Sequence, residues 1–215
     1  MIELKSLSTE DAKLLQNGLK TLGFYDGSTR GLPGPKTEAA YKAYLDSFQS
    51  VASTPDAFTS MGDALAAILK AEEGVREVPA NSNRGKRVED YQVATWLTGT
   101  GWPWCAAFIC WGIRELEKTH PLPFKRPQTG GAWDFENWAK SQGVKRFKPR
   151  GKIKAGDIVI FTFSHIGLAI EDEKGGSVKT IEGNTDASGS REGGGVYIKS
   201  RPVSSIRSHI RLELA

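Results

Sequence analysis

The order of the sequence patterns predicts an α+β fold, with helices first and an antiparallel sheet after them. Up to about residue 143, apolar side chains recur at the three- and four-residue spacing of helices. From Lys154 onward the spacing changes to alternation and short β-branched runs, separated by turns of Gly, Ser and Asp. Helical segments followed by strands in this order are typical of an α+β domain.

Length and composition limit the protein class. The chain has 215 residues, enough for one full domain of about 150 residues and a smaller one. Its 39% hydrophobic composition is ordinary for a soluble globular protein. Nowhere does the sequence approach the ~20 apolar residues of a membrane span, and its first fifteen residues contain no export signal. We therefore expect no membrane span, synthesis in the cytoplasm, and another route of release for any action outside it.

Residues 1–49 carry the pattern of a small helical domain. Ser8 with Asp11 resembles a helix start, and Gly23 is typical of a helix end. Between them, one helical face is expected to carry Leu14, Leu15, Leu19 and Leu22. A second helix is expected from Pro35, with an apolar stripe of Tyr41, Tyr44, Leu45 and Phe48. Two helices bury little surface alone, so this unit could equally be a cap packed on the main domain.

The same region resembles the small peptidoglycan-binding domain of many cell-wall hydrolases, over roughly residues 5–48. The resemblance is carried by Leu15-Gln16, Leu19, Leu22-Gly23-Phe24-Tyr25-Asp26-Gly27 and Gly34-Pro35-Lys36-Thr37-Glu38-Ala39-Ala40. It implies binding to the bacterial wall. Where that family usually has an Asp-Gly-Phe-Gly run, residues 29–34 read Thr-Arg-Gly-Leu-Pro-Gly, so an altered binding groove is expected.

The main domain is expected over residues 61–215, after a polar linker at 50–60 that lacks apolar periodicity. Its expected helices cover residues 64–73, 88–97, 105–118 and 130–143. Its expected strands cover residues 158–163, 166–170, 178–182, 195–200 and 206–214. All helices of this domain should therefore precede its strands.

Cys105 follows an extended Gly-Trp-Pro-Trp segment and begins a run of helix formers, so it should lie at a helix N-terminus. The helix dipole and unpaired N–H groups at such a position stabilise a thiolate. Cys105 is therefore a candidate nucleophile, although free cysteines are also common as buried structural residues. Cys110 is too far along the same helix for a disulfide, and its apolar neighbours predict a core position.

A thiolate nucleophile needs a base, and the sequence offers three histidines. His120 precedes a proline about 22 Å of helical rise beyond Cys105, too far to reach it. His209 alternates with arginines and is expected on the solvent face of a strand. His165 shares a strand face with the small residues Gly167 and Ala169, which leave room beside an imidazole. Elimination favours His165 as the base, against the alternative of a hydrogen-bonded core histidine.

The base must itself be oriented by a carboxylate or an amide. The segment Ile181-Glu182-Gly183-Asn184-Thr185 offers both at the end of the next strand, which a hairpin would place beside His165. Glu182 is the preferred residue. Glu171 is the competitor, but it begins the charged turn Glu171-Asp172-Glu173-Lys174, where a solvated role suits it better.

Four separated motifs resemble the CHAP domain, the cysteine- and histidine-dependent amidohydrolase/peptidase module, over roughly residues 62–215. They are Trp104-Cys105-Ala106-Ala107-Phe108, Ala155-Gly156-Asp157-Ile158-Val159-Ile160-Phe161, Ser164-His165-Ile166-Gly167 and Glu182-Gly183-Asn184. The resemblance implies a papain-like fold, hydrolysis of amide bonds in peptidoglycan, and a catalytic set of Cys105, His165 and Glu182 with Asn184 nearby. Some members bind calcium through aspartates just before the cysteine. Residues 98–104 contain no carboxylate, so neither a metal nor another cofactor is expected.

The expected chemistry is acyl transfer, with attack by Cys105, an oxyanion held by its backbone N–H, and proton donation by His165. Asn83 and Trp104 are candidate substrate-binding residues of the cleft. The basic stretch at 140–154 could steer the enzyme to an anionic wall or be a solvated loop. Nucleic-acid binding is not expected, because no recognised motif or basic-aromatic pattern accompanies those charges.

These features predict a monomeric peptidoglycan amidase or endopeptidase, most simply a phage endolysin. The same chemistry would serve a secreted antibacterial effector or a virion-associated lysin, which genomic neighbours would distinguish. A non-catalytic wall-binding or structural protein is disfavoured, because every group required for catalysis is present.

Overall fold

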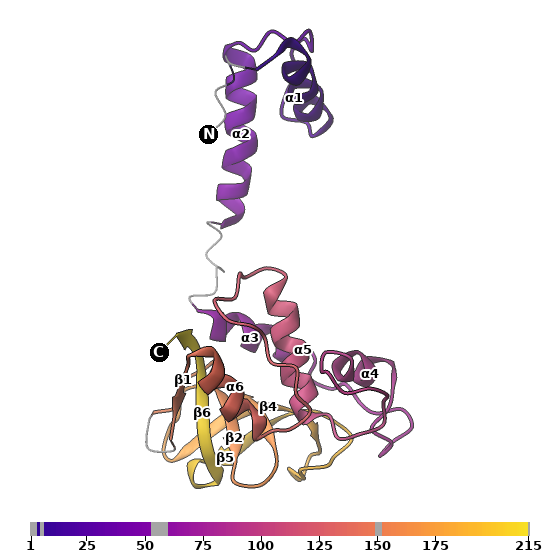
Figure 1. The fold of residues 1–215 in the computed structure, drawn as a ribbon, viewed down its shortest axis with the longest axis vertical. Coiled ribbons are helices and arrows are strands. Elements are labelled where there is room, and N and C mark those ends of the chain that lie inside the picture. The colour runs from indigo at the N-terminus through magenta and orange to yellow at the C-terminus, as the bar shows by residue number, and fades with distance from the viewer. Residues whose placement is uncertain (1–3, 5–6, 53–59, 149–151, 215) are drawn as a thin grey trace. The chain divides into compact units, whose positions relative to one another are not determined.

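The structure, a computed structural model of the 215-residue chain, describes residues 4, 7–52, 60–148 and 152–214. The chain divides into two compact units, Met1–Ala57 and Phe58–Ala215. In the described residues, six α-helices precede the six strands of one antiparallel sheet, which confirms the predicted α+β class (Figure 1). None of the described helices is long and apolar enough to cross a membrane.

The first unit is built from α1 (Thr9–Thr21) and α2 (Pro35–Ala52). The Ser8 hydroxyl accepts a hydrogen bond from the Asp11 backbone N–H and so caps α1. Because α2 runs to Ala52, the first residues of the predicted linker are helical, and its residues 53–59 lie outside the described part. The unit has its own small core, formed by Leu15, Leu19, Phe24, Tyr25, Ala40, Tyr41 and Tyr44. Phe48 of the predicted stripe lies where side chains are not described.

The apolar face predicted for α1 is wrong at two of its leucines. Leu14 is 71% exposed and Leu22 is 57% exposed, because the buried face is formed by Ala12, Gln16 and Leu19 instead. Gln16 can be buried because the loop before α2 satisfies its amide. Its oxygen accepts a 2.9 Å hydrogen bond from a backbone N–H at position 31, and its nitrogen donates to the Thr37 hydroxyl at 3.1 Å.

The second unit is organised around a sheet with the strand order β1-β6-β2-β3-β4-β5, in which each neighbouring pair is antiparallel. The strands are β1 (Val144–Phe147), β2 (Ile158–Phe161), β3 (Ile166–Ala169), β4 (Ser177–Thr185), β5 (Gly195–Pro202) and β6 (Ile206–Leu214). The sequence pattern does not predict β1. Its four residues include Lys145 and Arg146, so this edge strand is hidden within the basic stretch.

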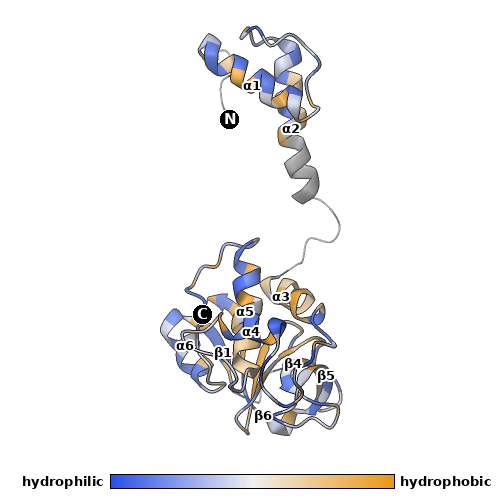
Figure 2. Ribbon diagram, turned by 90° about the vertical axis from the view of Figure 1, so that its right-hand side faces the viewer, coloured by the Kyte–Doolittle hydropathy of each residue, from blue (hydrophilic) through white to orange (hydrophobic). Residues whose placement is uncertain are grey.

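The helices of the second unit are α3 (Met61–Lys70), α4 (Lys86–Gln92), α5 (Cys105–Glu117) and α6 (Asp134–Gln142). α4 and α6 are shorter than predicted, whereas α5 begins and ends where the sequence places it. α5 is buried along most of its length and packs against α3, α4, β3 and β4. In Figure 2, hydrophobic colours predominate in α3, one of the helices that pack against α5. Because α5 begins at Cys105, this packing fixes the cysteine relative to the sheet.

The other face of the sheet is also covered, which corrects the prediction for His209. A second cluster of buried apolar residues lies there, formed by Ile153, Val159, Phe161, Ala169, Val178 and Ile206. The register of β2 against β6 shifts after Ile160, so Ile206 lies on the same face as His209 and not opposite it. His209 is 0% exposed and stacks on Phe147 at 5.0 Å between ring centroids. It therefore does not face solvent.

Candidate active site

Cys105 is the first residue of α5 and borders a cleft. The residue is 6% exposed, and the cleft of about 250 Å³ beside it is also lined by Leu97, Trp102, Pro103, Ser164, Arg191 and Glu192. No side chain caps α5, and the first N–H groups of an α-helix have no partner within the helix. These N–H groups and the helix dipole favour negative charge on the sulfur and on an oxygen beside it.

His165 lies just before β3 and is held by aromatic contacts and one hydrogen bond. It is 0% exposed, and its ring stacks with Phe161 and Phe163 at 5.6 and 6.0 Å between centroids. Its Nε2 lies 3.0 Å from Oε2 of Glu182. Its Nδ1 has no hydrogen-bond partner among the described residues. Nδ1 is therefore the ring nitrogen that remains for proton exchange with Cys105.

The pKa of His165 shows that Cys105 and Glu182 both act on it. Burial lowers the pKa of an imidazole because it disfavours the cation. Here the Cys105 sulfur and the Glu182 carboxylate outweigh burial and raise the pKa of His165 to about 9. A pKa of about 9 favours the protonated form of His165 at neutral pH.

Glu182 lies on β4 and is completely buried. Its Oε1 accepts hydrogen bonds from the Thr180 hydroxyl at 2.5 Å and from Nε of Arg201 at 2.8 Å, and its Oε2 accepts from Nη2 of Arg201 at 2.5 Å. Burial alone would raise the pKa of Glu182, but the bonds from Arg201 and His165 hold it at about 2. Gly167 makes room for this side chain, since a Cβ there would lie 2.7 Å from Cγ of Glu182.

Arg201 and Thr180 are site residues that the sequence analysis missed. Thr180 gave a usable signal, because it lies two residues before Glu182 and so on the same face of the strand. Arg201 gave none. Its position depends on the register of β5 against β4, in which it pairs with Val178, four residues before Glu182 on β4.

Asn184 supports the segment before Cys105. Its backbone has a positive φ of 58°, and its Oδ1 accepts a 3.0 Å hydrogen bond from the Trp104 backbone N–H. Its Nδ2 donates to the Gly193 carbonyl at 2.9 Å and to Oδ1 of Asn83 at 3.2 Å. Among the described residues, none of these side-chain hydrogen bonds joins Asn184 to His165. Asn83, which is predicted to bind substrate, contacts Asn184 and is not among the residues that line this cleft.

Trp104 is placed differently from the prediction that it contacts substrate. It is 0% exposed, its Nε1 donates to Oε1 of Glu77 at 2.9 Å, and its ring packs against Tyr91 and Phe108. A Cβ at Gly183 would lie 2.7 Å from this ring, so a glycine is required there for close packing. Trp102, two residues earlier, lines the cleft instead.

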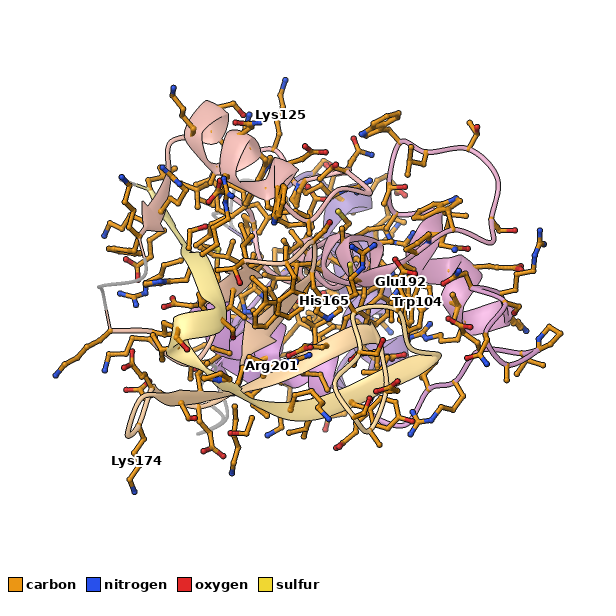
Figure 3. The ribbon with its side chains drawn as sticks, turned by 90° about the horizontal axis from the view of Figure 1, so that it is seen from below. Trp104, Lys125, His165, Lys174, Glu192 and Arg201 are labelled. Atoms are coloured by element: carbon orange, nitrogen blue, oxygen red, sulfur yellow. The ribbon has the colours of Figure 1, made fainter. Side chains whose placement is uncertain are left out.

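Unlike His209, three other candidates that the sequence analysis set aside lie where it placed them. Cys110 is 0% exposed, lies 3.4 Å from the Thr129 carbonyl, and burial raises the pKa of its thiol to about 12. Glu171 is 56% exposed and pairs with Lys179 at 2.8 Å. His120 follows the far end of α5 and lies beside the Thr119 hydroxyl. Figure 3 shows His165, Trp104 and Arg201 in the interior, whereas Lys125 and Lys174 extend to the outside.

The basic stretch at 140–154 is partly neutralised by carboxylates from other segments. Its ion pairs join Lys145 to Glu213, Arg146 to Glu136, and Lys154 to Asp172. Arg150 lies outside the described residues. These pairs weaken the case for a uniformly positive steering surface. Within the ranges that the structure describes, no group of three or more His, Cys, Asp or Glu side chains could hold a metal ion.

Comparison with known families finds that residues 97–184 match the CHAP domain. This range holds Cys105, His165, Glu182 and Asn184, and it ends before Arg201. A CHAP domain implies a cysteine- and histidine-dependent hydrolase that acts on amide bonds of peptidoglycan. No curated protein matches the chain.

Proposed function

We propose that this protein hydrolyses an amide bond of bacterial peptidoglycan with Cys105 as the nucleophile. One observation carries the proposal. Cys105 begins a helix at the border of a cleft and interacts with the buried imidazole of His165, which has one nitrogen held by a carboxylate and the other without a hydrogen-bond partner among the described residues. This is the arrangement that activates a thiol for acyl transfer.

In the first half of the reaction, the thiolate of Cys105 attacks the carbonyl carbon of the bound amide, and its electrons move onto the carbonyl oxygen. The N–H groups at the start of α5 stabilise the resulting oxyanion. His165 then donates its Nδ1 proton to the leaving nitrogen, the C–N bond breaks, and a thioester remains on Cys105.

In the second half, the neutral His165 accepts a proton from water, which attacks the thioester. The C–S bond breaks, the carboxylic product leaves, and the thiolate–imidazolium pair is restored. Glu182 stays ionised throughout, because its pKa of about 2 lies far below neutral pH. Its role is to hold Nε2 of His165 and stabilise the cation.

The first unit supports a more specific role. We infer that Met1–Ala57 binds the cell wall and that the protein is of the endolysin type. Its resemblance to wall-binding domains and its separate core around Leu19 support this inference. A secreted effector or a virion-associated lysin would use the same chemistry, and a non-catalytic wall-binding protein is the alternative from another class.

Digestion of purified peptidoglycan tests the catalytic proposal. The wild type should release soluble fragments with new amino and carboxyl termini, and mass spectrometry of these fragments would identify the bond cleaved. Cys105→Ala should release none, while Cys110→Ala should retain activity with a moderate loss of stability. Lysis by folded Cys105→Ala protein would overturn the proposal. Loss of wild-type activity in a chelator, with recovery on addition of calcium, would refute the predicted absence of a metal.

Sedimentation with intact sacculi tests the wall-binding inference. Full-length Cys105→Ala protein should pellet with sacculi, whereas a chain beginning at Ser60 should remain in the supernatant. The wild-type chain from Ser60 should still cleave soluble peptidoglycan fragments. If that shortened chain precipitates on its own, the first unit is a structural cap and not a binding module.

A further inference from the structure

Arg201 grips both carboxylate oxygens of the residue that orients the catalytic imidazole. Its Nε and Nη2 lie 2.8 and 2.5 Å from Oε1 and Oε2 of Glu182. The Oε2 atom that accepts from Arg201 is also the atom 3.0 Å from Nε2 of His165. This oxygen therefore contacts both the guanidinium and the imidazole. The two hydrogen bonds from one guanidinium fix the plane of the carboxylate.

Arg201 is itself held firmly. Its side chain is 12% exposed, and its guanidinium lies 5.2 and 5.7 Å from the ring centroids of Phe161 and Phe163. The same two rings stack with His165. Nη1 of Arg201 donates to the Gly189 carbonyl at 3.1 Å, in the loop that also carries Arg191 and Glu192 of the cleft. Arg201 therefore joins the orienting carboxylate, the rings around the base and the cleft loop.

The charge of Arg201 has a consequence for the base. A carboxylate with no other cation would give its full charge to His165, which would then hold its proton more tightly. An imidazolium that holds its proton too tightly is a poor acid toward the leaving nitrogen. By sharing Glu182, Arg201 reduces this effect while keeping the carboxylate ionised.

We propose that Arg201 is a positioning residue of the active site, which fixes the Glu182 carboxylate and keeps His165 able to release its proton to the leaving amine. The proposal rests on the proposed amide hydrolysis. A second arginine, which binds a buried carboxylate away from the cleft, provides a control that separates this role from a purely stabilising one. Arg211 binds both oxygens of Asp157 at 2.8 and 2.9 Å, and Asp157 is 0% exposed.

The charged groups that act on His165 come from three elements. Cys105 at the start of α5 and Glu182 on β4 act on it directly, and Arg201 on β5 reaches it through Glu182. The contacts from its own segment are the uncharged rings of Phe161 and Phe163. A change at Arg201 should therefore appear in the titration of the cysteine–histidine pair.

The test measures the rate at which iodoacetamide alkylates Cys105 as a function of pH, with peptide mass spectrometry separating Cys105 from Cys110. Arg201→Gln should move the alkaline inflection upward by about one pH unit, because it removes one cation near His165. The kcat for peptidoglycan hydrolysis should fall at least tenfold, with KM little changed. Arg211→Gln, the matched control, should lose stability but keep the wild-type inflection.

A conservative variant keeps the proposal testable if Arg201→Gln does not fold. Arg201→Lys retains the charge but replaces the planar fork with a single point donor. Its inflection should stay near that of the wild type, while kcat should fall severalfold. An unchanged inflection in folded Arg201→Gln, or an unchanged kcat in Arg201→Lys, would overturn the proposal. Alkylation needs no peptidoglycan, so a shifted inflection in an enzyme that does not cleave the wall would refute the proposed function alone.

Discussion

The sheet holds two clusters of an arginine, a buried carboxylate and a buried histidine, and they behave in opposite ways. In the cleft cluster, Arg201 grips Glu182, and Glu182 lies 3.0 Å from His165. In the cluster away from the cleft, Arg211 grips Asp157, and Asp157 lies 3.7 Å from His209. The pKa of His165 is raised to about 9, whereas burial lowers the pKa of His209.

The difference lies in what surrounds each imidazole. Asp157 also accepts a 2.9 Å hydrogen bond from the Lys154 backbone N–H, and neither ring nitrogen of His209 has a hydrogen-bond partner among the described residues. His165 has a carboxylate within hydrogen-bond distance and a thiol on its other side. A buried carboxylate near a histidine is therefore insufficient to charge it. The direct hydrogen bond to Glu182 and the nearby Cys105 side chain make the difference at His165.

Substitution of the two histidines should give the largest contrast. His165→Ala removes the acid and base of the reaction, so hydrolysis should fall by about 10²–10⁴-fold. His209→Phe replaces a neutral ring that stacks on Phe147, so hydrolysis should stay within about twofold of the wild type. Rates on purified peptidoglycan, with circular dichroism to verify folding, would measure both. Equal losses in the two variants would show that the two clusters do not differ in function.

Substitution of the two carboxylates should separate activity from stability. Glu182→Gln and Asp157→Asn each leave a gripping arginine without its anion, and each should cost about 3–5 kcal/mol of unfolding free energy. Only Glu182→Gln should also reduce hydrolysis tenfold or more, because a hydrogen bond to a charged group is worth roughly 1.5–3 kcal/mol.

The pH profile distinguishes these carboxylate variants further. Loss of the Glu182 charge lowers the pKa of His165, so the alkaline limb of hydrolysis should move to lower pH in Glu182→Gln. Asp157→Asn should keep the wild-type limb in the folded fraction of the protein. If Asp157→Asn shifted the limb and Glu182→Gln did not, the assignment of the orienting carboxylate would be wrong.

The smallest expected effect concerns stability in acid. The folded pKa of His209 lies below the ordinary value of about 6.5, so the unfolded chain binds a proton more readily than the folded one. The wild type should therefore lose stability as pH falls below about 6.5, and His209→Phe should lose less. Urea unfolding at pH 7 and pH 5 would measure this difference, which parallel losses in both proteins would contradict.

Local patterns predicted much of the architecture. The Gly-Trp-Pro-Trp segment before Cys105 predicted the start of α5, and the strand pattern at residues 206–214 predicted β6 (Ile206–Leu214). Elimination among three histidines pointed to His165, and hairpin connectivity pointed to Glu182. The structure brings these two side chains together with Cys105, because β3 and β4 are adjacent antiparallel strands that pack against α5.

The errors arose where long-range packing decides the outcome. The bulge in β6 and the second cluster around Ile153 bury His209, and neither can be read from alternation within one strand. Trp104 points inward because Glu77, from a distant segment, satisfies its indole N–H. Arg201 reaches Glu182 only through the register of β5 against β4. The positions of these three side chains depend on contacts between segments that are far apart in the sequence.

Nitrogen-15 NMR of the histidine side chains between pH 5 and pH 10 tests the central claim most directly. His165 should remain an imidazolium until the pH approaches about 9, while His209 stays neutral near pH 7. In Cys105→Ala, the pKa of His165 should fall, because the sulfur that helps to stabilise the cation is gone. A His165 that titrates near 6.5, or whose titration is the same in Cys105→Ala, would contradict the account of a coupled cysteine–histidine pair.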